Sequence, residues 1–182
     1  MVARTQRREG LLQLDIEAPA IAARVGRLES VAVNGVCLTV ARVRQATLGF
    51  ELITETLRCT TLGRLRAGSR VNLEPSLTLT DRLNGHVVLG HIDGMGTLAS
   101  RREQRGELVL TIRVPRSLRR WLVPKGPVTV DGVSLTIGST ITPTTFTIHL
   151  IPETLRQTTL RSLQPGNRVN LEADYLAKLV RQ

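Results

Sequence analysis

The chain consists of two copies of one sequence module. Residues 55–74 and 153–172 are identical at 14 of 20 positions, with an offset of 98 residues. A second pair of matching segments begins at Asn34 and Asp131, an offset of 97, and a third begins at Leu14 with an offset of 96. This near-constant offset means that the copies differ only by small loop changes. Two domains of one fold are therefore expected, rather than one continuous domain.

Each copy is expected to consist of short β-strands. Runs rich in β-branched residues, such as VTVDGVSLTIG and TFTIHLI, are bounded by Gly, Asn, Asp or Pro, which is typical of strands and tight turns. Several short strands in one copy would leave unpaired edges unless the sheet closes on itself. We therefore predict an all-β fold with two tandem Greek-key β-barrels of about six strands each, the first over residues 1–86 and the second over residues 87–182.

Helical structure is expected in three short segments. The related sequences ETLRCTTLGRL and ETLRQTTLRSL lie between strand-like runs, and each should form a helical turn before a tight turn at Gly68 or Gly166. Residues 173–182 have apolar side chains at helical spacing after Asp174, a suitable N-cap. We expect a short C-terminal helix there.

Copy two opens with the motif GHIDGMG, which has no counterpart in copy one. The motif runs from Gly90 to Gly96 and precedes Thr97, and the residue equivalent to Thr97 in copy one is Met1 itself. Either the natural chain starts further upstream or the first barrel lacks its N-terminal strand. We favour an upstream start, because a barrel without one strand has an unpaired edge and a gap in its core.

The net charge of +10 does not by itself indicate a nucleic-acid partner. Only Lys125 and Lys178 are lysines, and the arginines that supply the remaining positive charge are spread along the chain. The aromatic residues, two Phe, one Trp and one Tyr, offer few surfaces on which bases could stack. We therefore expect no nucleic-acid partner; a basic barrel of that class would bind with a steep salt dependence.

Cysteine content and hydropathy exclude further classes. Cys37 and Cys59 are the only cysteines and lie 22 positions apart, which fits neither a disulfide framework nor a structural zinc site. No apolar run reaches the roughly 18 residues that a membrane span needs, and the Arg-rich start has no apolar stretch behind it. These features predict a cytoplasmic protein with free thiols, no bound metal and no membrane partner.

The repeated motifs together resemble riboflavin synthase. They are NGVCLTV and ETLRCTTLG in copy one, GHIDGMG at the junction, and DGVSLTI, HLIPETLRQTTL and VNLEADYLAK in copy two. The resemblance covers nearly the whole chain, and paired motifs at these spacings are far more specific than a single short pattern. One departure is the family's N-terminal Met-Phe-Thr-Gly motif, which lines the first pocket and is absent from this sequence.

This resemblance implies an enzymatic activity. Riboflavin synthase is a transferase that needs no cofactor and converts two molecules of 6,7-dimethyl-8-ribityllumazine into riboflavin and 5-amino-6-(D-ribitylamino)uracil. Because the reaction joins two identical molecules, a duplicated module with two similar pockets suits it. In the family the productive pair of pockets forms between the first barrel of one subunit and the second barrel of another, in a homotrimer. Lumazine synthase is a further partner that the resemblance suggests.

The resemblance also assigns residues to two lumazine-binding pockets. The first would be built from Cys37, Leu38, Thr39, Glu51, Leu52, Ile53, Thr54, Glu55 and Thr56. The second would use Gly90, His91, Ile92, Lys125, Ser134, Leu135, Thr136, His149, Leu150, Ile151, Pro152, Glu153 and Thr154. Polar side chains and backbone groups of this kind suit a ring system with alternating donors and acceptors and a polyol chain.

Cys37, His91 and Ser134 are the expected catalytic residues. Cys37 and Ser134 are equivalent in the repeat, and a thiol opposite a hydroxyl is what two diverged sites would have; a small buried strand residue is the alternative. We expect Cys37 to position or polarise a bound nucleophile, because the sequence identifies no base that would activate the thiol. His91 is preferred as the proton carrier, with His86 and His149 as rivals.

Other repeated residues have a structural interpretation as well as a functional one. Glu55 and Glu153 begin the ETLR motif in both copies and could serve a ligand in each copy or cap a turn in each. Arg58 and Arg156 are expected to pair with acidic side chains for structural reasons. Cys59 is not repeated in copy two and is expected to be inert.

A lumazine- or flavin-binding protein without catalysis, on the same two-barrel scaffold, is the main alternative function. The gap at the start of copy one favours this alternative. Retention of Cys37, His91, Lys125 and Ser134 favours the enzyme, because a carrier needs only one good pocket.

Overall fold

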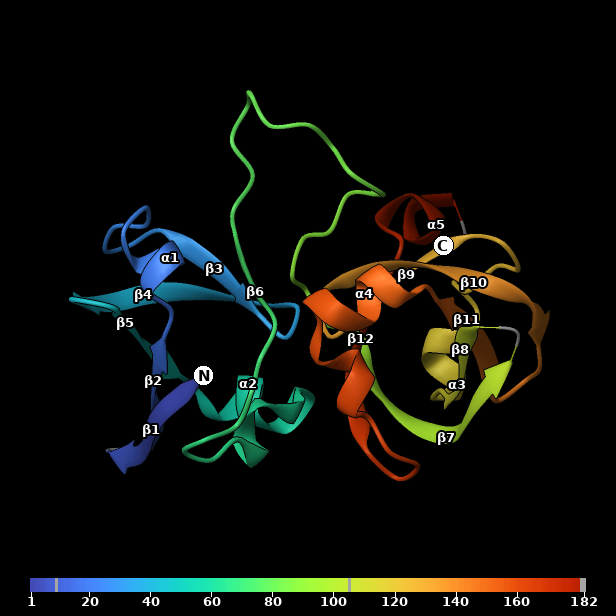
Figure 1. Ribbon diagram of the computed structural model, residues 1–182, viewed down its shortest axis with the longest axis horizontal. Coiled ribbons are helices and arrows are strands. Elements are labelled where there is room, and N and C mark those ends of the chain that lie inside the picture. Colours follow the sequence, from blue (N-terminus) through green and yellow to red (C-terminus); the bar gives the residue numbers. More distant parts are fainter. Residues whose placement is uncertain (9, 105, 181–182) are drawn as a thin grey trace.

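The structure is a computed structural model that describes residues 1–8, 10–104 and 106–180. Its strands form two antiparallel six-stranded sheets, one from each half of the chain. Figure 1 shows the N-terminal half in blue and teal beside the C-terminal half in yellow to red. The prediction of a mainly β fold in two related halves is confirmed.

The two halves have the same order of elements along the chain. The first half contains β1 (Val2–Arg8), β2 (Leu11–Glu17), α1 (Pro19–Ala22), β3 (Ser30–Val33), β4 (Val36–Arg44), β5 (Thr47–Leu52), α2 (Thr54–Cys59), the 3-10 helix η1 (Thr61–Arg64) and β6 (Leu73–Pro75). The second contains β7 (Gly94–Gln104), β8 (Glu107–Arg113), α3 (Arg116–Arg119), β9 (Pro127–Val130), β10 (Val133–Ile141), β11 (Thr145–Leu150), α4 (Pro152–Gln157), the 3-10 helix η2 (Thr159–Ser162), β12 (Arg168–Ala173) and α5 (Tyr175–Val180).

Strand order is also shared, but only the second sheet is closed. The first sheet has the order β1-β2-β5-β4-β3-β6, and the second has the equivalent order with β12 also paired to β7, which makes a barrel. Residues 94–97 of β7 form these closing pairs, with Gly94 opposite Leu171 and Thr97 opposite Arg168. Their equivalents fall before Met1, and among the described residues β6 pairs with β3 alone. A strand upstream of Met1 stays a prediction.

Each sheet encloses its own hydrophobic core. Apolar residues alternate along the strands, so that Leu108, Leu110 and Ile112 of β8 all point inward. Phe50 and Phe146 are both fully buried, one in each core. The two cores share no residue. Residues 76–93 connect one sheet to the other. The predicted domain boundary at residues 86 and 87 falls in this crossing segment and stays a prediction.

The predicted helical segments are present as short helices. Each ETLR motif forms an α-helix followed by a 3-10 helix, α2 with η1 and α4 with η2, and Gly68 and Gly166 adopt positive φ in the turns that follow. Before α5, Asp174 Oδ1 accepts a hydrogen bond from Leu176 N at 3.3 Å. Residues 181–182 of the predicted C-terminal helix lie outside the described residues. No helix in the described part of the chain is long and apolar enough to cross a membrane.

Two asparagines join the halves through hydrogen bonds that occur in reciprocal pairs. Asn170 Oδ1 accepts from Thr61 N in the first half, and Asn72 Oδ1 accepts from Thr159 N in the second, both at 2.8 Å. Asn170 Nδ2 donates to the carbonyl of Asn34, whereas Asn72 Nδ2 donates to that of Asp131, both at 2.9 Å. Exchange of roles between equivalent residues is what a local two-fold axis produces.

The backbones of the two halves touch at this axis. A Cβ added to Gly35 would lie 2.5 Å from Gly132 N, and one added to Gly132 would lie 2.8 Å from Gly35 N. Both residues also have positive φ, 77° and 83°. Only glycine allows this close approach, which brings the neighbouring turns, and the strands that start after them, together.

Candidate functional site

Cys37 and Ser134 occupy equivalent places in two rows of facing strand residues. Strand pairing places Ala32 of β3 between Cys37 of β4 and Glu74 of β6, and it places Thr129 of β9 between Ser134 of β10 and Glu172 of β12. The sequence therefore predicted the equivalence of Cys37 and Ser134 correctly. We call these sets the first row (Cys37, Ala32, Glu74) and the second row (Ser134, Thr129, Glu172).

A cleft of about 1120 Å³ lies between the two halves, and the two rows differ in how much of each is open to it. All three residues of the first row line it, but only Ser134 of the second row does. The second row is covered by residues 76–93, which we call the strap. In Figure 1 the strap, in green, rises away from both sheets and returns beside α5. Strap residues His86 and Gly90 also line the cleft.

Ser134 is hydrogen-bonded to His86 of the strap. The distance from His86 Nδ1 to Ser134 Oγ is 2.8 Å, and His86 Nε2 lies 3.2 Å from Thr129 Oγ1. Burial lowers the pKa of the half-buried His86, although Asp174 opposes this change. A neutral imidazole has one acceptor nitrogen and one N–H group, so it can accept a hydrogen bond from one hydroxyl group and donate a hydrogen bond to the other.

Cys37 is exposed and lies under Gly90 of the strap. Its N–H donates to the Gly90 carbonyl at 2.9 Å, and a Cβ on Gly90 would lie 2.7 Å from the Cβ of Cys37. Gly90 has a positive φ of 77°, so both its conformation and its surroundings require glycine. The two sites are thus contacted by one segment, at Gly90 in the first half and at His86 in the second.

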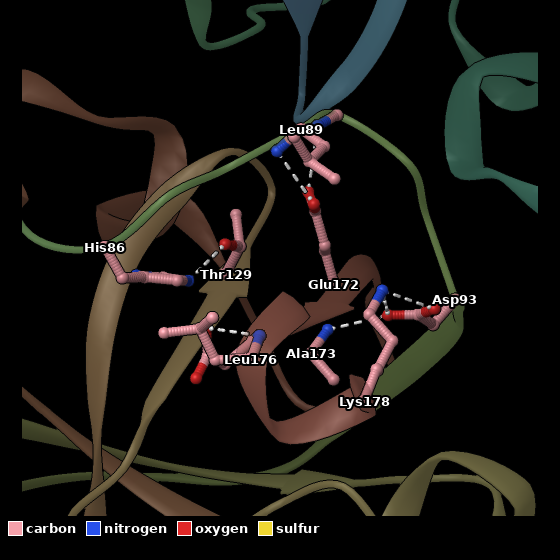
Figure 2. A network of polar contacts seen from close by, with 10 residues as sticks. His86, Leu89, Asp93, Thr129, Glu172, Ala173, Leu176 and Lys178 are labelled. Atoms are coloured by element: carbon pink, nitrogen blue, oxygen red, sulfur yellow. Dashed lines mark hydrogen bonds and ion pairs between the residues drawn. The ribbon is translucent and has the colours of Figure 1, made fainter. Parts of the chain in front are cut away.

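Glu172 and Asp93 hold the strap to the second barrel (Figure 2). The two oxygens of Glu172 accept hydrogen bonds from Leu89 N at 2.9 Å and Gly90 N at 3.0 Å. Asp93 accepts from Ala173 N and pairs with Lys178 Nζ, both at 2.8 Å. Burial raises the pKa of Glu172, while the two backbone N–H groups and Lys178 act in the opposite direction.

The other residues predicted for the first pocket lie on an outward-facing surface. Thr39 and Glu51 are exposed and border a smaller hollow of about 390 Å³ with Arg42, which pairs with Glu51 at 3.1 Å. Leu38 and Leu52, in contrast, are buried in the core. Ile53, Thr54, Glu55 and Thr56 continue this surface at the start of α2 and are exposed or half-buried.

Residues predicted for the second pocket are divided between the two halves. Gly90 contacts Cys37, and Ile92 packs against the core of the first half, with the exposed His91 between them. The structure thus brings His86, and not His91, to Ser134. The remaining residues lie on the second barrel: Lys125, Thr136, His149, Ile151, Pro152 and Glu153 are exposed, Leu135 and Thr154 are half-buried, and Leu150 is in the core.

Two predicted binding residues have partners on the protein surface. Glu55 accepts two hydrogen bonds from Arg58 and one from Cys59, and the Arg58 bonds lower the pKa of Glu55 to about 2. Glu153 accepts hydrogen bonds from Gln157 and Arg156, which also lower its pKa. The predicted pairing of Arg58 and Arg156 with acids is therefore confirmed, and it favours the structural interpretation of both glutamates.

Thr129 and Glu172 are the site-supporting residues that sequence reasoning missed. One signal was available: the Gly-His pair recurs at residues 85–86 and 90–91, and the VNLE motif recurs in both copies. Nothing local shows which Gly-His pair meets which strand. Within residues 1–8, 10–104 and 106–180, no group of three or more His, Cys, Asp or Glu side chains is arranged to hold a metal ion.

Comparison with known proteins agrees with the duplicated fold. The sequence model of the family described as "Lumazine binding domain" matches residues 1–76 and 89–174. The chain is 44% identical to riboflavin synthase of Mycobacterium tuberculosis over 171 residues, which are 92% of this chain and 85% of that protein. It is 38% identical to riboflavin synthase of Bacillus subtilis over 167 residues, 92% of this chain and 77% of that protein.

Solved structures of LumP have the same fold. LumP complexed with 6,7-dimethyl-8-(1'-D-ribityl) lumazine has a TM-score of 0.85 at 25% identity, with 95% of this chain and 93% of LumP covered. LumP complexed with riboflavin has a TM-score of 0.86 at 26% identity, with 95% and 94% covered. Fold and site together define a protein with two lumazine-binding domains. The chain belongs to the riboflavin synthase family of transferases.

Proposed function

We propose that the protein converts two molecules of 6,7-dimethyl-8-ribityllumazine into riboflavin and 5-amino-6-(D-ribitylamino)uracil by transfer of a four-carbon unit. The observation that carries this proposal is the duplicated pair Cys37 and Ser134. Each occupies the equivalent position of one of two related sheets, so that every chain supplies one site of each kind. A reaction between two identical molecules needs two similar sites near one another.

In this reaction the protein's own groups orient two rings and move protons. Ser134 and neutral His86 form a pair that can take up and release a proton at one ring, because the imidazole is within hydrogen-bonding distance of the hydroxyl. Cys37 would position or polarise the nucleophile at the other ring. His91, which is exposed and follows Gly90, would carry protons at the second ring, beyond the reach of His86. No cofactor enters the proposed reaction.

The finer features of the family are proposed with the activity. We propose a cytoplasmic homotrimer in which the first half of one subunit meets the second half of another, so that each reacting pair spans two chains. The predicted pocket residues of both halves would line these contacts. Lumazine synthase is proposed as a partner, and no nucleic acid or membrane is. The proposed domain boundary lies at residues 86 and 87.

Formation of riboflavin from the lumazine by the purified protein tests the proposed activity. Riboflavin and the pyrimidine should appear in equal amounts, measured by chromatography. Ser134→Ala and His86→Gln should each lower kcat by about 100-fold or more if the pair transfers protons. Ser139→Ala, on the exposed part of the same strand, is the matched control and should leave kcat unchanged. If the wild-type protein formed no riboflavin, the proposed enzymatic activity would be refuted.

Binding without turnover is the second candidate function. LumP, which shares the fold, has been solved in complex with a lumazine and with riboflavin. A carrier would quench or shift the fluorescence of the added lumazine at a stoichiometric ratio, and the lumazine would be recovered unchanged. Ser134→Ala would then change affinity only.

A further inference from the structure

Glu172 is a buried acid with an unusual set of partners. The residue is 2% exposed, and its carboxylate accepts hydrogen bonds from two neighbouring backbone N–H groups of the strap, those of Leu89 and Gly90. Hydrogen bonds to a carboxylate are stronger than those between neutral groups. Asp93 and Lys178 are the charged groups that face it, and these two neutralise one another across a 2.8 Å ion pair.

The equivalent acid in the first half shows that the strand itself does not require a buried carboxylate. Glu74 ends the same VNLE sequence, and it is exposed at the edge of the cleft. The middle residues of the two rows also differ in burial: Thr129 is fully buried and hydrogen-bonded to His86 of the strap, whereas Ala32 is half-buried. The burial of Glu172 therefore results from the strap that lies over it.

The strap connects the Glu172 carboxylate to the contacts at Cys37 and at Ser134. Gly90, whose N–H is bound to Glu172, presents its carbonyl to Cys37 N. His86 is three residues before Leu89, and its ring reaches Ser134 and Thr129. A shift of Leu89 and Gly90 would thus move the contacts of Cys37 and of Ser134 together.

We propose that Glu172 is a positioning residue, which holds the strap so that Gly90 lies against Cys37 and His86 against Ser134. Its effect on turnover rests on the proposed function, but its effect on the strap does not. Glu172 touches neither Cys37 nor Ser134 itself, and it acts through the backbone of Leu89 and Gly90. The contacts of the strap at Cys37 and at Ser134 thereby depend on one side chain of the last strand.

The test compares wild type with Glu172→Gln, which keeps the shape of the side chain but can accept only one of the two N–H groups well. Amide hydrogen exchange at Leu89 and Gly90 should become about tenfold faster or more, since a hydrogen bond to a charged group is lost. Alkylation of Cys37, resolved from that of Cys59 by mass spectrometry, should accelerate severalfold, with Cys59 as internal reference. Glu29→Gln, which removes a carboxylate that binds Gly26 N at 3.1 Å, is the matched control and should change neither rate.

Kinetics separate positioning from general destabilisation. Glu172→Gln should lower kcat by about tenfold with a smaller change in KM, because reacting groups are misplaced while most ligand contacts remain. If Glu172→Gln does not fold, Glu172→Asp, whose carboxylate is too short to reach both N–H groups, takes its place. Unchanged exchange at Leu89 and Gly90, or unchanged Cys37 alkylation, in a folded variant would overturn the proposal. Wild type without riboflavin formation would refute the proposed function alone, because exchange and alkylation would still decide the role of Glu172.

Discussion

Asp131 occupies in copy two the position that Asn34 occupies in copy one, and its carboxyl group is almost completely buried. The residue is 5% exposed, and its Oδ1 accepts from Asn170 N at 2.8 Å, as Asn34 Oδ1 accepts from Asn72 N. Burial raises the pKa of Asp131 from 3.8 to about 7, against the opposing effect of the Asn170 N–H. Asp131→Asn should keep the hydrogen bond and remove the ionisable group.

The direction of the pH effect follows from the two pKa values. Because the folded protein retains a proton that the unfolded chain releases above a pKa of 3.8, the free energy of unfolding falls as the pH rises from about 4 to about 7. At about 1.4 kcal/mol per pKa unit, the full loss is at most about 4 kcal/mol. Asp131→Asn should therefore match wild type near pH 4 and be more stable near pH 8, by up to this amount.

Urea unfolding at a series of pH values measures this difference. Trp121, the single tryptophan, packs against the core of the same half and reports its unfolding by fluorescence. The contributions of other titrating groups to the free energy of unfolding cancel when the variant is compared with wild type at each pH. The reciprocal variant Asn34→Asp should introduce the same pH dependence in the first half. A difference between Asp131→Asn and wild type that is constant from about pH 4 to about pH 8 would refute a raised pKa of Asp131.

Three further predictions concern the core, the junction and the site. Phe146→Ala should lower the free energy of unfolding by about 3–5 kcal/mol, measured with urea, because the ring is fully buried; a loss below about 1 kcal/mol would contradict this packing. Asn170→Ala should cost about 1–3 kcal/mol by the same measurement, since it leaves the buried Thr61 N–H without its acceptor, and an unchanged unfolding midpoint would argue against the reciprocal junction. Cys37→Ala, at an exposed position, should reduce turnover without lowering the melting temperature. Co-refolded with Ser134→Ala, it should partly recover activity if each reacting pair spans two chains, whereas activity no higher than the mean of the separate variants would count against such a site.

Local sequence patterns determined most of the fold. The alternation of apolar residues in ELVLTIR and LLQLDIE predicts strands with one buried face, and both β8 and β2 have that pattern of burial. The repeat then predicts that the halves share one strand order, which they do. It also identifies Cys37 and Ser134 as equivalent, because side-chain direction in paired strands depends only on register.

Contacts between residues distant in the sequence decided the rest. The GHIDGMG motif favours His91 as the proton carrier, and only the path of the strap shows that His86 reaches Ser134, 48 positions away. The same VNLE sequence ends with an exposed Glu74 in one half and a buried Glu172 in the other. Burial, and with it the pKa of Asp131 and of Glu172, depends on what covers a strand. Local periodicity specifies which face of a strand a residue occupies, but the covering segment is set by the packing of the whole chain.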